Sequence, residues 1–136
     1  MITPSLDALR TALHLLGVSV WIGGQIVLAG IVPVLRTTAP DALGAVARAF
    51  AKLAWPMFLL IVLTGIWGYV DIDAPTKSSA YTITFGVKML LVAVTAIASL
   101  VHAQGTSRAA KAIGGAASLV SALGAAWLGV LLAHPT

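Results

Sequence analysis

Four stretches of mostly apolar residues follow one another along the chain, with short polar segments between them. Each is close to or above the roughly 20 residues that an α-helix needs to cross a bilayer. The pattern predicts an all-α integral membrane protein, a single domain over residues 1–136. Because the connections are short, neighbouring helices run antiparallel, as an up-down-up-down bundle of four transmembrane helices. The predicted spans are about residues 11–35, 53–70, 81–103 and 113–133.

The polar segments carry turn and capping residues. Residues 37–41 form a predicted turn, with Asp41 as the N-cap of an amphipathic lead-in to the second span. Residues 71–79 predict a polar loop, and Gly105 suits the C-cap of the third span. The first span is too long, and its flanks too different, for a cleaved signal peptide, so we expect it to be retained.

Composition strengthens the membrane assignment. The chain is 60% hydrophobic and 9% charged, and its mean hydropathy is +1.03. These values exclude an ordinary water-soluble domain, so a lipid bilayer is the expected partner. Cysteine is absent, and no basic patch with aromatic partners points to nucleic acid. A homo-oligomer and a larger membrane complex both stay open.

The eight Lys and Arg residues are distributed unevenly between the two sides. The positive-inside rule places the basic first and third loops in the cytoplasm. Both termini and the loop at 71–79 then face outward, in a multi-pass protein of the cell's inner (plasma) membrane. The first and third loops carry Arg36, Arg48, Lys52, Arg108 and Lys111, and the opposite side carries Arg10 and Lys77.

Ionisable residues inside spans are the best candidates for function, since burying them in lipid is costly. His14 and Lys88 lie about 5 and 10 Å inside the outer ends of their spans, at about 1.5 Å per residue. Gly17 and Trp21 share the face of His14 and are candidate cofactor-binding residues, Gly17 by letting a flat macrocycle approach the backbone and Trp21 as a cofactor wall. His134 ends the fourth span at the same surface and is a weaker candidate metal ligand. Each has a purely structural alternative: a hydrogen bond across the helix seam for His14, an outward-reaching amine for Lys88, and solvation for His134.

The assembled segments resemble the CopD-like (copper resistance D) membrane domain. Residues 12–36 resemble its first helix, residues 47–66 its "RFSRL…LTG" helix and residues 81–91 its "YG…LLVKL" helix. More loosely, the chain is similar to HemJ-type protoporphyrinogen oxidases, small four-helix membrane proteins. In that family a first-span histidine and a third-span lysine mark the heme site, and these positions correspond to His14 and Lys88.

Three functions follow. The first is a heme b-binding redox protein, such as a membrane oxidoreductase, with His14 as an axial ligand and a neutral Lys88 amine as second ligand or polar wall. The second is copper or other metal uptake or resistance, with His14, His134, Asp71 and Asp73 as an outer-face site. The third is a cofactor-free accessory subunit of a larger complex, packed through small residues. The residues favour heme over copper.

Overall fold

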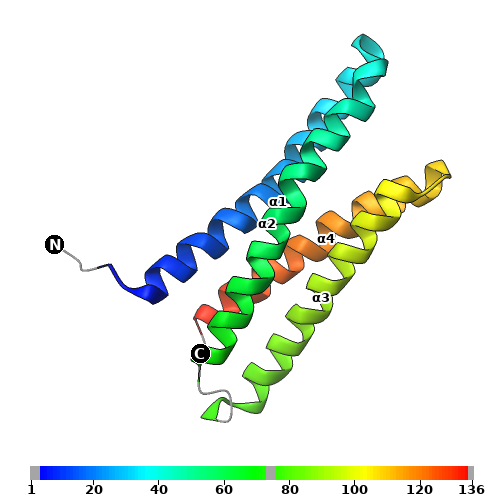
Figure 1. Cartoon of the computed structure of the whole chain (residues 1–136). Helices are drawn as coiled ribbons and strands as arrows, with labels where there is room; N and C mark the ends of the chain where they lie inside the picture. The colour runs from blue at the N-terminus through cyan, green and yellow to red at the C-terminus, as the bar shows by residue number, and fades with distance from the viewer. Residues whose placement is uncertain (1–3, 73–75, 135–136) are drawn as a thin grey trace. The chain divides into compact units, whose positions relative to one another are not determined.

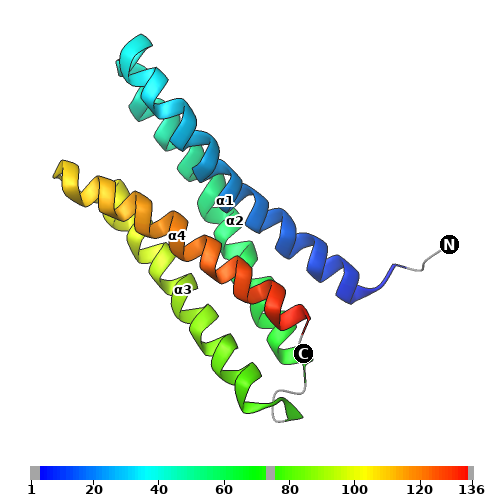
Figure 2. The same cartoon turned by 180° about the vertical axis from the view of Figure 1, so that it is seen from behind.

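Four long helices make up almost all of the protein. A computed structural model describes residues 4–72 and 76–134. The chain divides into two compact units, of which α1 and α2 form the first and α3 and α4 the second. In each unit the two helices lie side by side as an antiparallel hairpin (Figures 1 and 2). The elements are α1 (Leu6–Thr38), a 3-10 turn η1 (Pro40–Ala42), α2 (Leu43–Asp71), α3 (Ser79–Gln104) and α4 (Arg108–Ala133).

The all-α prediction with four membrane spans is confirmed in its main point. All four helices are long and apolar enough to cross a membrane, so the chain is a multi-pass membrane protein. No strand occurs in the described ranges. The union of the two hairpins into a single domain and one bundle stays a prediction.

All four helices begin before the apolar stretches that predict them, and α1, α2 and α3 also end beyond those stretches. α1 begins at Leu6 rather than near residue 11, because the Ser5 hydroxyl caps it by accepting from the Ala8 N–H at 3.1 Å. α4 begins at Arg108 rather than near residue 113, where the Ser107 hydroxyl accepts from the Ala110 N–H at 3.0 Å. Helices continue into the polar interface, so the end of the apolar run does not mark the end of the helix.

The predicted cap of the second helix is wrong. Asp41 lies in the η1 turn, and the N-cap of α2 is Ala42, which makes no side-chain capping bond. Pro40 starts the 3-10 turn, in which the Ala42 N–H donates to the Ala39 carbonyl at 3.0 Å. The turn runs directly into α2, so no separate side-chain cap forms at its start.

The other two boundaries follow the sequence. α3 ends at Gln104, and its C-cap is Gly105, whose N–H donates to the Val101 carbonyl at 2.8 Å. The polar loop lies between the end of α2 and the start of α3, where the Ser78 hydroxyl caps the helix. Asp73 and Pro75, also predicted in this loop, lie outside the described residues.

Glycine brings α1 and α2 into close contact. A Cβ on Gly17 would lie 2.7 Å from Ile61 Cγ1 and 2.9 Å from the Met57 carbonyl oxygen. A Cβ on Gly24 would overlap the Phe50 ring. Only hydrogen fits at these two positions, which explains two of the glycines on the inward face of α1.

Small and hydroxyl side chains fill the seam between α3 and α4. A Cβ on Gly114 would lie 2.7 Å from the His102 backbone nitrogen and 2.8 Å from the Ala98 carbonyl oxygen. The Thr95 hydroxyl donates to the Ser118 carbonyl at 2.8 Å, and the Ser118 hydroxyl lies 2.7 Å from that of Ser99. These bonds satisfy polar groups that the apolar seam would otherwise leave unpaired.

Candidate functional site around His14

His14 hydrogen-bonds across the first hairpin. Its half-buried imidazole projects from α1 toward α2, where Nδ1 lies 2.8 Å from Oγ1 of Thr64. Thr64 is only 3% exposed, and its neighbour Gly65 lies next to the ring: a Cβ there would make an ordinary van der Waals contact with His14 Cε1, at 3.7 Å. The seam hydrogen bond expected from the structural alternative is therefore present, with a threonine as partner.

The direction of this bond follows from the hydrogens available. A threonine hydroxyl has one hydrogen to donate. The Thr64 hydroxyl donates to the Leu60 carbonyl at 2.6 Å, with the Ile61 carbonyl at 3.1 Å. The Thr64 oxygen therefore accepts from His14, and Nδ1 carries the proton. In the neutral ring the basic lone pair then belongs to Nε2.

This hydrogen bond is similar to one that metal-binding histidines often make. Their second ring nitrogen donates to a fixed acceptor, which sets the tautomer and the orientation of the ring. Thr64 is a positioning residue of this kind for His14. In the sequence it stands out only as part of the Leu63-Thr64-Gly65 segment of the family resemblance, and helical periodicity alone gives it no role.

One turn from His14 toward the start of α1, Arg10 also packs on α2. A Cβ on Gly68 would lie 2.5 Å from Arg10 Nη1 and 3.0 Å from its Cζ, so the guanidinium rests on the glycine. Arg10 forms a salt bridge with Asp7, in which Nε and Nη2 both donate to the single oxygen Oδ1. The Arg10 side chain is 21% exposed, against 73% for Asp7.

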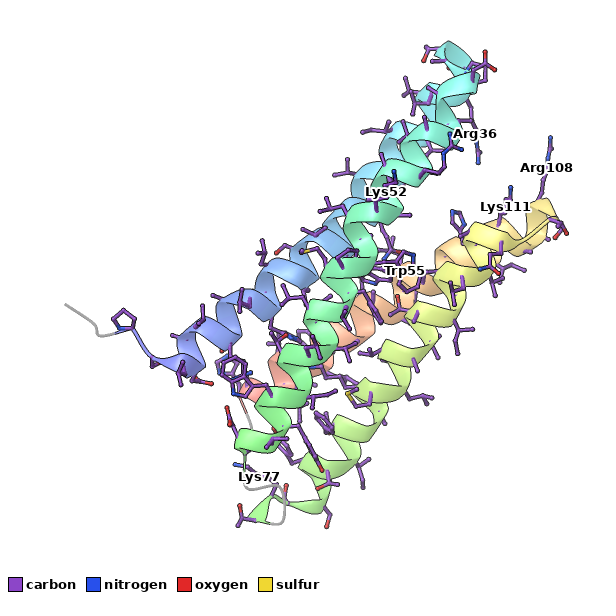
Figure 3. The ribbon with its side chains drawn as sticks, viewed as in Figure 1. Arg36, Lys52, Trp55, Lys77, Arg108 and Lys111 are labelled. Carbon is purple, nitrogen blue, oxygen red and sulfur yellow. The ribbon has the colours of Figure 1, made fainter. Side chains whose placement is uncertain are left out.

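Gly17 and Trp21, predicted near the cofactor, are occupied with helix packing. Ile61 fills the space above Gly17. Trp21 is 4% exposed, and its ring centroid lies 4.6 Å from that of Phe58 and 5.4 Å from that of Trp55. Trp55, which is labelled in Figure 3, belongs to the same aromatic cluster, with its ring centroid 5.8 Å from that of Phe58. The packing of α1 on α2 accounts for both residues without a cofactor.

Lys88 lies in the second hairpin, where it rests on α4. A Cβ on Gly129 would lie 3.2 Å from Lys88 Nζ and 3.6 Å from its Cε. The side chain is half-buried, and the carboxylates in the described ranges give it no salt bridge. Lys88 thus folds back on its own hairpin. That it shares a site with His14 stays a prediction.

The two remaining histidines are exposed. Nδ1 of His102 lies 2.6 Å from the Lys111 carbonyl oxygen, to which it donates, at the loop end of the second hairpin. His134 follows the last residue of α4. Within either hairpin, the described residues contain no group of three or more His, Cys, Asp or Glu able to hold a metal ion.

Comparisons of the chain with models of known protein families, with curated proteins and with solved structures gave no match. The CopD-like and HemJ-type resemblance therefore stays a prediction, and the functional argument depends on the residues themselves.

Proposed function

We propose that this protein is a heme b-binding redox or electron-transfer protein of the cell's inner membrane, with His14 as an axial ligand. The observation that carries the proposal is the bond from His14 Nδ1 to Thr64, whose own hydrogen is donated to Leu60. It fixes the imidazole on α1 with the basic lone pair at Nε2.

The residues around His14 fit a flat, largely apolar group. The ring lies next to Gly65, where α2 has no side chain, and apart from Arg10, one turn away, most neighbouring positions on α1 are apolar. A bound heme b supplies one-electron redox chemistry. The chain's own contribution is to hold the imidazole at a fixed angle and to surround it with lipid and apolar side chains, which keep water away.

Charge supports placing this site in the outer half of the membrane. Arg36 and Lys52 lie toward the loop end of the first hairpin, and Arg108 and Lys111 lie at the loop end of the second (Figure 3). The positive-inside rule assigns these ends to the cytoplasm. His14, near the opposite end of α1, then lies toward the outer surface, as do both termini.

The proposal is tested by absorption spectroscopy on full-length protein purified in mild detergent from heme-supplemented cells. Oxidised and dithionite-reduced spectra, with metal analysis of the same sample, are compared for wild type, His14→Ala and His102→Ala. We expect a Soret band that is lost in His14→Ala and kept in His102→Ala, the matched histidine of the other hairpin. A wild type without heme, or a Soret band that survives in His14→Ala, would refute the proposal.

A further inference from the structure

Arg10 is an unusual residue for its position. The first hairpin contains four basic residues, and the other three, Arg36, Arg48 and Lys52, belong to the loop end. The positive-inside rule explains those three and gives no reason for a cation at the opposite end. Arg10 is also held among helices rather than extended into solvent, since its guanidinium lies on Gly68.

The ion pair with Asp7 does not explain this placement. Asp7 is largely exposed, and an exposed pair of this kind contributes little to stability. The pair also uses the guanidinium incompletely: Nε and Nη2 share one carboxylate oxygen, and the described residues offer no acceptor to Nη1. A guanidinium can bind a carboxylate through two parallel N–H bonds, and the N–H groups that Asp7 does not use can still form such a pair.

Arg10 and His14 belong together. They are four residues apart on one helix, so their side chains lie on the same face about 6 Å apart along the axis. Both side chains contact α2: Arg10 packs on Gly68, and His14 packs beside Thr64 and Gly65. Of the two residues, Arg10 is nearer the start of α1 and therefore nearer the outer aqueous side.

We infer that Arg10 binds a free carboxylate of the ligand held by His14, so that the site takes a porphyrin with ionised propionates rather than an esterified one. This inference rests on the proposed function. Heme carries two propionates at one edge of an apolar ring, and a heme held by His14 would need a cation nearby to pair with them. The only basic side chain one turn outward from His14 on α1 is Arg10.

The test uses full-length, heme-free protein in detergent, titrated with hemin and with hemin dimethyl ester. We expect wild type to bind hemin about tenfold or more tightly than the ester, the range for charge-assisted hydrogen bonds. Arg10→Gln should lose this preference while keeping the Soret band. Arg36→Gln, the same change at the other end of α1, should keep it.

Gly68→Ala provides a second test that leaves the charge in place. The added Cβ would lie 2.5 Å from Arg10 Nη1 and must displace the guanidinium, so the preference for hemin should fall severalfold. If wild type binds both compounds equally, or Arg10→Gln keeps the preference, the inference fails while the proposed function stands. If wild type binds neither, the proposed function itself fails.

Discussion

The substitution Thr64→Val isolates the role of the hydrogen bond to His14. Valine has nearly the shape of threonine, so it removes the acceptor of the 2.8 Å bond from His14 Nδ1 without opening a cavity. A buried N–H left without a partner costs about 1–3 kcal/mol. Loss of the group that orients a metal-binding histidine typically lowers metal affinity about 10–100-fold.

We therefore expect Thr64→Val to bind heme about 10–100-fold more weakly than wild type, and Thr64→Ser to restore binding. The assay is a heme titration followed at the Soret band, combined with unfolding of the same detergent-solubilised samples. The titration measures ligand affinity, and the unfolding measures the general cost of losing a buried hydroxyl.

The matched control is Thr95→Val in the second hairpin. Thr95 is also a buried helical threonine, 2% exposed, and its hydroxyl donates to the Ser118 carbonyl at 2.8 Å. Its loss should lower stability by about 1 kcal/mol and leave heme affinity unchanged. Equal heme affinities in Thr64→Val and wild type, or an equal loss in Thr95→Val, would refute the positioning role of Thr64.

Three further predictions concern packing, charge and orientation. Gly114→Ala should destabilise the protein by about 1–3 kcal/mol, because its Cβ would meet backbone atoms. Gly86→Ala, whose Cβ would meet no described atom within 4 Å, should stabilise it by up to about 1 kcal/mol. Unfolding in detergent measures both, and equal effects of the two substitutions would contradict the described packing of Gly114. Lys88→Met should raise the unfolding stability by about 1 kcal/mol, since it removes a half-buried amine that has no acidic partner among the described residues. Lys111→Met, the control at an exposed lysine, should change stability little. A destabilised Lys88→Met would show that the amine has a favourable partner. Alkaline phosphatase fused after Thr136 should be active, because the C-terminus is expected outside the cytoplasm. If that fusion is inactive and a fluorescent protein fused at the same position is bright, the assigned orientation is wrong.

The sequence predicts the helices well because the bilayer imposes a simple requirement on them. A long apolar run must satisfy its backbone hydrogen bonds internally, and in a chain without strand patterns this means helix. The ends are harder, because Ser5 and Ser107 cap helices in polar segments that hydropathy does not mark. Asp41 was the obvious capping residue before α2, and the turn begun by Pro40 made that cap unnecessary.

The site was predictable only in part. Helical periodicity and the cost of burial select His14, but the partner of its Nδ1 lies 50 residues away, on a helix whose rotation the sequence does not fix. The rotation of α2 also determines the contacts of Gly17 and Trp21. They share the face of His14, but Gly17 packs against Ile61 and Trp21 packs in the aromatic cluster. Periodicity shows which residues share a face, and only the packing shows what that face meets.

The seams also determine how this chain must be made. Glycines and small hydroxyl residues close each hairpin, so most large apolar side chains point away from it, among them Leu6 and Val70, which are 72% and 74% exposed. A finished hairpin released into water would present that surface to other newly made chains and aggregate. Between synthesis and insertion into lipid, this surface therefore has to be covered, by the insertion machinery or by a chaperone.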